Sequence, residues 1–71
     1  MVNKDLFRTM VKKLLEHPDR FERIFAAQYL ARYTRERSEK FLYEALADPD
    51  PEVVACVQHL LGKIQQGRKE P

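Results

Sequence analysis

The stretch that decides the fold is Leu46-Ala47-Asp48-Pro49-Asp50-Pro51-Glu52-Val53, which lies between two segments whose apolar residues recur at helical spacing. Proline cannot continue a helix interior, but its fixed φ suits the first helical turn. An aspartate before such a proline can accept hydrogen bonds from the free N–H groups of that turn. We therefore expect Asp48-Pro49 to end one helix and Asp50-Pro51 to begin the next.

A second corner of the same form lies earlier in the chain, at His17-Pro18-Asp19. The residue before a proline is pushed out of the helical region, so a helix should end near His17. Asp19 is followed three residues later by Glu22, which is the spacing of a capping box. The sequence therefore predicts that Asp19 caps a helix and that Glu22 reaches back to the Asp19 backbone.

The apolar spacing on both sides of the two corners predicts an all-α fold with four helices. The first three should be capped by Asn3, Asp19 and Ser38, with a polar connection over residues 34–38. Gly67 should end the last helix, because glycine is common just past a helix C-terminus. The expected helices cover residues 4–16, 20–33, 39–47 and 51–65.

The two halves of the chain align without a gap when the sequence is shifted by 31 residues. This shift pairs Leu15 with Leu46 and places Pro18-Asp19 on Pro49-Asp50. Self-similarity at such a period is typical of helical solenoids, in which each repeat is one antiparallel helix pair. We therefore expect a single domain with a first repeat over residues 4–33, a second over 34–67 and a frayed tail over 68–71.

Composition limits the classes of protein to which this chain can belong. Its 71 residues are 44% apolar and 34% charged, which suits one small globular domain with a modest core. The net charge of +2 does not by itself indicate nucleic acid. The single cysteine, Cys56, excludes an internal disulfide and fits a reducing compartment. No apolar run approaches the length of a membrane span and no signal-peptide pattern is present, so we expect a cytoplasmic protein.

Four motifs of the second half follow one another in an order known from one repeat family. A short polar turn comes first, then a helix ending in Leu, an Asp-Pro-Asp-Pro-Glu-Val corner and a helix ending in Leu-Gly-x-Ile. They are found here at Thr34–Arg37, Glu44-Ala45-Leu46, Asp48–Val53 and Leu61-Gly62-Lys63-Ile64. In this order they resemble a unit of the HEAT-like repeats typified by the phycobilisome-lyase family. The resemblance implies two stacked helical hairpins, that is, a short α-solenoid whose second helices line an inner surface.

The first half matches this pattern less fully. It has Ala31 in place of the glycine, but it keeps Arg23 where such repeats usually place an arginine. The second half has Val54 at that arginine position. The resemblance thus implies an Asp–Arg pair between the repeats that has no counterpart at the C-terminal end, where Val54 leaves an extra apolar side chain.

If the second helix of each repeat lines the inner surface, the 31-residue shift identifies the side chains that face it. An apolar strip edged by cationic and polar groups would form a protein-binding groove. The alternative is that a solenoid of only two repeats buries these aromatic residues in its own core. The candidates are Phe21, Ile24, Phe25, Gln28 and Arg32 in the first repeat, and Ala55, Cys56, His59 and Lys63 in the second.

The last helix carries apolar residues over a wide arc, and Val54 adds to it. End repeats of a solenoid usually have polar outer faces, because no further repeat covers them. We therefore expect a homodimer, or docking to a larger partner, through this helix, with Val54 in the contact.

The residues offer little for catalysis or metal binding. Cys56 and His59 are neighbours on one helix, but no orienting carboxylate or oxyanion loop accompanies them. His17 and His59 lie far apart and neither belongs to the His-Glu motifs of metal-dependent hydroxylases with HEAT-like repeats. We predict no catalytic residue, no cofactor and no metal site.

The sequence thus predicts a non-catalytic protein-interaction or adaptor module. Two alternatives stay open. One is an accessory or small lyase-like role in bilin or cofactor attachment, similar to that of the resembled family. The other is weak nucleic-acid binding through the central basic cluster, although glutamates are interleaved with it. The cluster consists of Arg20, Arg23, Arg32, Arg35, Arg37 and Lys40.

Overall fold

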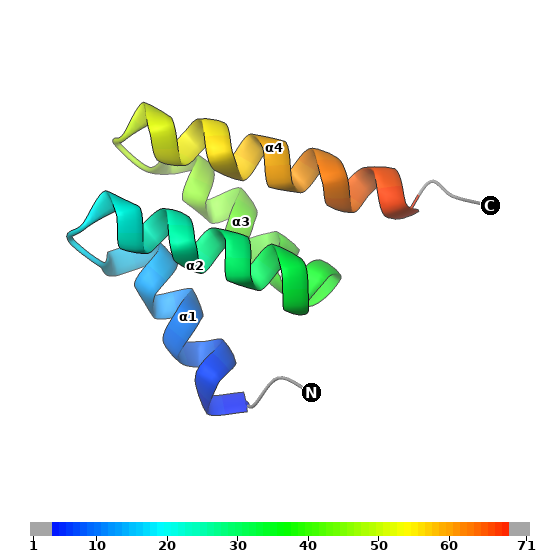
Figure 1. Ribbon diagram of the computed structural model, residues 1–71, viewed down its shortest axis with the longest axis horizontal. Coiled ribbons are helices and arrows are strands. Elements are labelled where there is room, and N and C mark those ends of the chain that lie inside the picture. Colours follow the sequence, from blue (N-terminus) through cyan, green and yellow to red (C-terminus); the bar gives the residue numbers. More distant parts are fainter. Residues whose placement is uncertain (1–3, 69–71) are drawn as a thin grey trace.

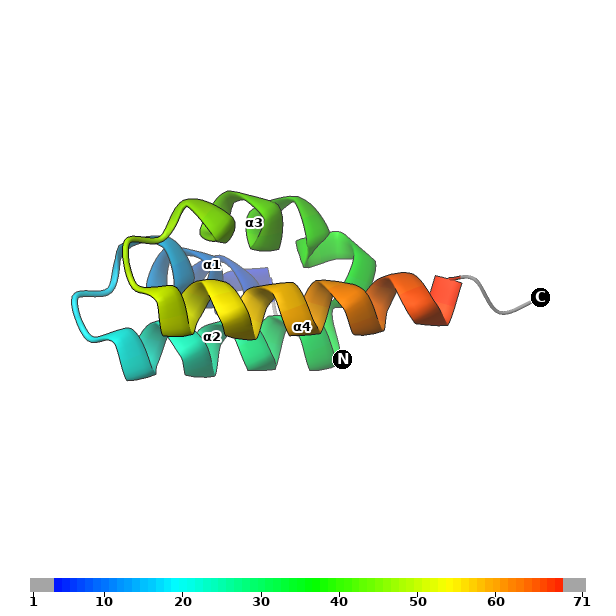
Figure 2. The ribbon, with the colours of Figure 1, turned by 90° about the horizontal axis from the view of Figure 1, so that it is seen from above.

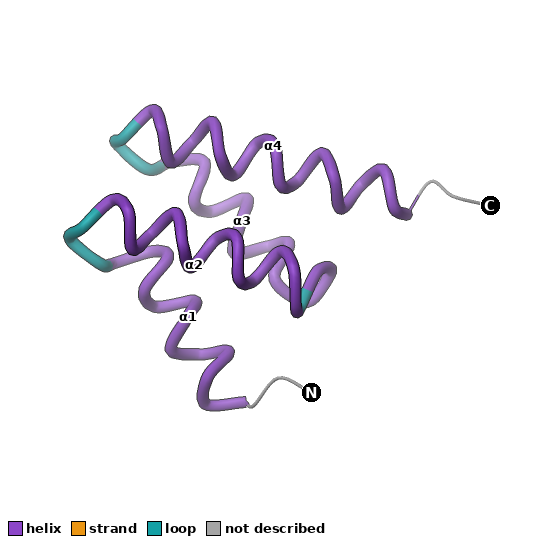
Figure 3. The backbone as a smooth tube through the Cα atoms, in the orientation of Figure 1, coloured by secondary structure: helices purple, strands orange, loops and turns teal. Residues whose placement is uncertain are grey.

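The computed structural model describes residues 4–68 of the chain, and these residues form helices joined by short turns, without a strand (Figure 3). The predicted all-α fold is confirmed. In chain order the elements are α1 (Lys4–Glu16), α2 (Arg20–Tyr33), the 3-10 segment η1 (Arg35–Ser38), α3 (Glu39–Glu44), the 3-10 segment η2 (Ala45–Ala47) and α4 (Pro51–Arg68).

The four helices are arranged as two antiparallel hairpins, α1–α2 and α3–α4, which stack side by side (Figure 1). Viewed from above, α2 and α4 form one layer and α1 and α3 form the other (Figure 2). The molecule is correspondingly thin, with principal extents of 40 × 28 × 15 Å. None of the helices in the described part of the chain combines the length and the apolar character needed to cross a membrane.

One apolar core runs between the two layers and joins the two repeats. Residues that are 31 positions apart occupy equivalent places in it: Ala26 and Val57 are both fully buried, and Leu30 and Leu61 are both buried. The largest fully buried apolar side chains come from all four helices and are Leu14, Leu30, Leu42, Val53 and Val57.

Both corners cap the helix that follows them in the same way. Oδ1 of Asp19 accepts the N–H of Phe21 at 2.8 Å, and Oδ1 of Asp50 accepts the N–H of Glu52 at 2.9 Å. In the second corner the backbone N–H of Asp50 itself donates to Oδ1 of Asp48 at 2.8 Å. The predicted aspartate caps are therefore confirmed, and they recur with the 31-residue shift.

The capping box predicted at the first corner is wrong. The backbone N–H of Asp19 donates to Nδ1 of His17 at 3.0 Å, so His17 takes the place that an aspartate holds in the second corner. Glu22 pairs instead with Nζ of Lys13 at 3.1 Å. The reason is competition: the imidazole already supplies the acceptor, and a lysine of α1 attracts the glutamate across the hairpin.

Arg23 ties the two corners together. Its Nε and Nη2 donate to the two carboxylate oxygens of Asp48, at 2.8 and 3.2 Å, and its Nη1 donates to the carbonyl oxygens of His17 and Pro18. The Arg23 side chain is 13% exposed and that of Asp48 is 6% exposed. This is the pair between repeats that the family resemblance implied.

Ser38 lies at the N-cap position predicted for the third helix, but its side chain makes no capping hydrogen bond there. Its hydroxyl is buried and lies within hydrogen-bonding distance of the carbonyl oxygens of Leu30, at 3.2 Å, and Arg35, at 2.8 Å. Helical winding already begins at Arg35, in what was expected to be a polar connection, so Ser38 is both the last residue of η1 and the residue before α3. The expected single helix over residues 39–47 is α3 followed by the 3-10 segment η2.

The predicted end of the last helix is also wrong, because α4 continues through Gly67 to Arg68. A glycine ends a helix when it adopts the left-handed conformation, and Gly67 does not have a positive φ. Of the predicted tail, Arg68 is thus the last helical residue, while 69–71 lie outside the described residues, as does the expected cap Asn3.

We expect that replacing Arg23 will destabilise the fold strongly. Arg23→Met leaves the Asp48 carboxylate almost buried without its cation, which should lower the free energy of unfolding by about 3 kcal/mol in urea denaturation. The matched control is Arg20→Met, which breaks a pair with Asp50 in which the Arg20 side chain is 45% exposed. It should cost less than about 1 kcal/mol.

The double variant Arg23→Met with Asp48→Asn should recover part of the loss, because it removes the unpaired charge and keeps an acceptor for the Asp50 N–H. Equal costs for Arg23→Met and Arg20→Met would contradict this account of the corner.

Stability should also fall in acid through Asp50. The N–H of Glu52, and next to it Arg20, hold the pKa of Asp50 below its ordinary value. A carboxyl with a lowered pKa in the folded state contributes stability above its unfolded pKa, and that contribution is lost as the pH falls through the folded pKa. Asp50→Asn keeps the cap but removes the charge. The difference in unfolding free energy between the wild type and this variant should shrink between about pH 5 and about pH 2; a constant difference would show that the charge has no role.

Candidate functional site

The layer made by α2 and α4 exposes the side chains that the repeat assigned to an inner face. Phe21 is 64% exposed and Phe25 is 54% exposed. The alternative interpretation, in which the chain buries these two aromatic residues in its own core, is therefore wrong. Their role in binding a partner stays a prediction. Of the other candidates, Gln28, Arg32, Ala55, His59 and Lys63 are exposed, while Ile24, Val54 and Cys56 are half-buried.

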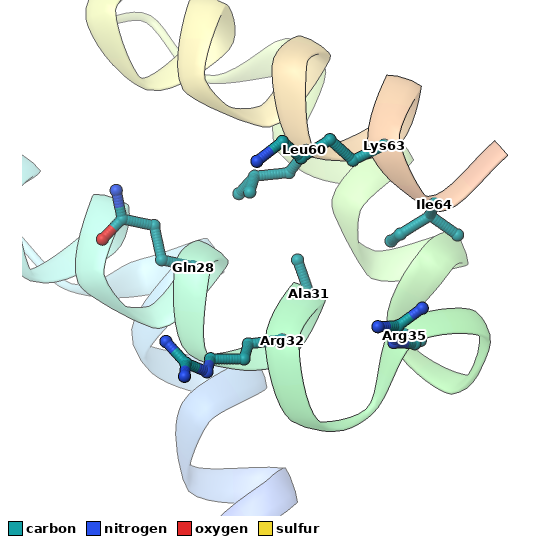
Figure 4. Close-up of a pocket in the computed structure, with 7 residues that line it drawn as sticks. All are labelled: Gln28, Ala31, Arg32, Arg35, Leu60, Lys63 and Ile64. Atoms are coloured by element: carbon teal, nitrogen blue, oxygen red, sulfur yellow. The ribbon is translucent and has the colours of Figure 1, made fainter. Parts of the chain in front are cut away.

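A groove of about 460 Å³ lies between α2 and α4 on this layer (Figure 4). It brings together three predicted residues, Gln28, Arg32 and Lys63. Figure 4 shows Gln28 and Arg32 rising from α2 and Lys63 from α4, on opposite sides of the groove. Of the other lining residues, Ala31, Leu60 and Ile64 were missed by the sequence-based reasoning, and Arg35 was predicted only as part of the basic cluster.

Two of the missed positions could have been found from the repeat. Leu60 and Ile64 lie 31 residues after Tyr29 and Tyr33, so large apolar or aromatic side chains recur at these positions in both repeats. The position of Arg35 in this groove could not have been predicted, because it depends on a backbone angle that no residue spacing predicts.

Arg35 has a φ of 37°, which lies in the left-handed region that a side chain rarely adopts. This turn follows the end of α2 and directs the guanidinium towards the last turns of α4. A Cβ atom at Gly67 would lie 3.8 Å from Nη1 of Arg35. The chain reversal therefore adds a third cation to a groove whose other cations come from α2 and α4.

The basic cluster predicted from the sequence is divided into separate groups. Arg20 pairs with Asp50, and Arg23 pairs with Asp48. Two more cations lie over aromatic rings of the α1 and α3 layer: Arg37 is 4.9 Å from the centre of the Phe7 ring and Lys40 is 5.0 Å from that of Phe41.

What remains of the cluster faces the groove. Arg32 and Arg35 line it together with Lys63, which was predicted to share the inner face with Arg32 but was not part of the basic cluster. Among residues 4–68, none of these three cations forms an ion pair with a carboxylate. Arg32 instead lies 5.6 Å from the centre of the Tyr33 ring.

An aromatic hollow adjoins the groove across α2. It is lined by Phe25, Tyr29 and Tyr33 and shares Gln28 and Arg32 with the groove. The rings of Tyr29 and Tyr33 lie 4.8 Å apart. The basic and the aromatic surfaces are therefore continuous.

Cys56 and His59 are not arranged as a catalytic pair. Burial raises the pKa of the Cys56 thiol, and a hydrogen bond with Gln28 opposes this shift only in part. A raised pKa keeps the thiol protonated and weakly nucleophilic. His59 is exposed, and within the described residues no hydrogen bond joins it to Cys56. In the same part of the chain, no group of three or more His, Cys, Asp and Glu side chains is arranged so that it could hold a metal ion.

The apolar residues of α4 are mostly used inside the chain. Val53, Val57, Leu61 and Ile64 are buried, and Val54 is half-buried. The wide apolar arc expected to be open for association is therefore largely covered. This finding does not test for a homodimer through α4. It does show that the exposed apolar surface of α4 is smaller than the sequence-based prediction of a homodimer assumed.

The outer side of α4 carries a glutamine and a glycine where the matching side of α2 carries two alanines. Ala31 lines the groove towards α4, and Ala27, one turn earlier on the same side of α2, is fully buried. The equivalent residues of α4 are Gln58 and Gly62, which are both exposed.

Two stacked helical hairpins whose second helices share one face define the chain as a short helical solenoid. A family model for HEAT repeats matches residues 8–70. The chain belongs to the HEAT repeat family, as the corner motifs indicated. Comparisons with curated proteins and with solved structures gave no match.

Proposed function

We propose that this HEAT repeat protein is a non-catalytic interaction module that binds a protein partner through the face formed by α2 and α4. HEAT repeats generally mediate protein–protein interaction. The observation that supports this face most strongly is the pair of exposed aromatic rings, Phe21 and Phe25, of which Phe25 lines the hollow that adjoins the basic groove. Exposed contiguous apolar surface is typical of interfaces, and aromatic residues are enriched among those that contribute most binding energy.

The absence of catalysis is part of this proposal. It is supported by the raised pKa of the Cys56 thiol, which leaves the one cysteine of the chain a poor nucleophile. An adaptor of this kind would act in a reducing compartment such as the cytoplasm, in keeping with a single cysteine.

Bilin attachment and nucleic-acid binding remain alternative proposals for the function, with less support than protein binding. An accessory role in bilin attachment, as in the phycobilisome-lyase type of repeat, would have to use Cys56 or His59, and a bilin-transfer assay tests it. Nucleic-acid binding would need several cations along one track. Its support is weakened by the ion pairs that hold Arg20 and Arg23.

Self-association is the second candidate for the partner, with Val54 of α4 in the contact. Sedimentation at high micromolar concentration tests it, since a homodimer would have twice the mass of 8.4 kDa calculated for one chain. A monomeric mass would leave a different protein as the partner.

The decisive variant is Phe25→Glu, which places a charge in the middle of the exposed aromatic surface. Nζ of Lys13 lies 5.9 Å from the centre of the Phe25 ring, so a glutamate here has a cation nearby and the fold should be kept. The matched control is Leu6→Glu on α1, where the side chain is 41% exposed. In affinity capture, Phe25→Glu should reduce partner recovery at least tenfold, corresponding to about 1.4 kcal/mol, while Leu6→Glu should not.

Circular dichroism of both variants controls for folding. Equal recovery of every partner by Phe25→Glu and the wild type would dispose of the proposed face.

A further inference from the structure

We propose that the groove between α2 and α4 binds an acidic peptide segment of a partner protein. Its carboxylates would pair with Arg32, Arg35 and Lys63, and an apolar side chain would lie against Ala31 and Leu60. This inference rests on the proposed function, because it names the chemistry of the partner at the same face.

Charge is the first argument. The polar side chains that line the groove are one amide, Gln28, and three cations, and no carboxylate is among the lining residues. Guanidinium groups bind carboxylates through two parallel hydrogen bonds, which favours Arg32 and Arg35 as anion-binding groups. A ligand that supplies two or three carboxylates would complement a surface that has cations and lacks their partners.

The floor of the groove is the second argument. Ala31 and Leu60 are half-buried and Ile64 is buried, so the base between the cations is aliphatic. A peptide can offer carboxylates and an aliphatic side chain together. A phosphate backbone offers charge alone to such a floor.

The layout of the remaining cations also favours a peptide over nucleic acid. Arg20 and Arg23 are held by aspartates, and Arg37 and Lys40 lie over rings of the other layer. Of the basic cluster, Arg32 and Arg35 are thus the residues that line the groove, whose volume of about 460 Å³ is typical of sites for small or segmental ligands.

The turn that carries Arg35 is held in place before any ligand arrives. Oγ1 of Thr34 donates to the carbonyl of Leu30 at 2.6 Å, and the hydroxyl of Ser38 lies 2.8 Å from the carbonyl of Arg35. Both hydroxyl side chains are buried. A cation held by a fixed turn loses less conformational freedom on binding than one on a free segment, which favours recognition at this position.

The first experiment uses three labelled peptides of twelve residues in fluorescence anisotropy. The test peptide alternates pairs of glutamates with single leucines. In one control peptide lysines replace the glutamates, and in the other serines replace the leucines. The test peptide should bind the wild-type protein, the lysine peptide should not bind, and the serine peptide should bind at least fivefold more weakly. Failure of the test peptide to bind at millimolar protein would overturn the proposal.

The second experiment locates the site with charge-matched variants. Lys63→Glu should weaken binding of the test peptide at least tenfold, whereas Lys12→Glu, the same charge change at an exposed position of α1, should change it less than twofold. Equal weakening by both variants would show that binding depends on net charge alone. That result would overturn the assignment of the binding site to the groove.

The variant Arg35→Gly tests the binding site without destabilising the fold. Glycine adopts a positive φ without strain, so this variant should melt no lower than the wild type and still bind the test peptide at least fivefold more weakly. Unchanged binding would remove Arg35 from the site and contradict the proposal.

A third probe separates the two ligand classes. A labelled twelve-nucleotide single-stranded DNA should bind more weakly than the test peptide at physiological salt. Tighter binding of the DNA would overturn the peptide proposal in favour of nucleic acid. If the test peptide fails to bind while Phe25→Glu still abolishes capture of the partner, the groove inference fails and the proposed function stands.

Discussion

The ion pair between Arg23 and Asp48 is the contact on which the arrangement of the two repeats depends. Aliphatic side chains between helices tolerate small shifts along the helix axes, because dispersion contacts have little directional preference. Two parallel hydrogen bonds to one carboxylate do not tolerate such shifts. Since Arg23 also bonds the carbonyls of the first corner, α2 and α4 begin at a fixed offset from each other.

The same corner is built twice with different side chains. In the first, an imidazole, His17, accepts the N–H of the capping aspartate, and in the second Asp48 does so. The difference between histidine and aspartate at this position affects the contact between the repeats. A carboxylate at the second corner can cap and also bind Arg23, whereas the imidazole at the first can only cap. The chain thus uses a single corner design as a helix start in both repeats and as a link between repeats in one.

The sequence allowed the helices, both corners and the exposed face to be predicted to a large extent, because each rests on local rules. Proline geometry and aspartate caps act within a few residues, and the 31-residue shift then ordered the inward and outward positions. The errors arose where two groups compete or where the backbone departs from its usual conformations. Glu22 was drawn to Lys13, Gly67 stayed helical, and Arg35 took a left-handed turn that brought it to the groove. Each of these depends on the helices already being packed.

The polar outer side of α4 has a consequence for assembly into filaments. If copies stacked head to tail with the geometry that joins the two repeats, Gln58 would occupy the fully buried place of Ala27, and its amide would lack hydrogen-bond partners. Val54 would face His17 where Arg23 meets Asp48, so the ionic link would be lost as well. Heterologous contacts that do not close generate open-ended fibres. Gln58 at the position equivalent to Ala27, and Val54 at the position equivalent to Arg23, therefore act against polymerisation, although the molecule consists of repeats that stack on each other.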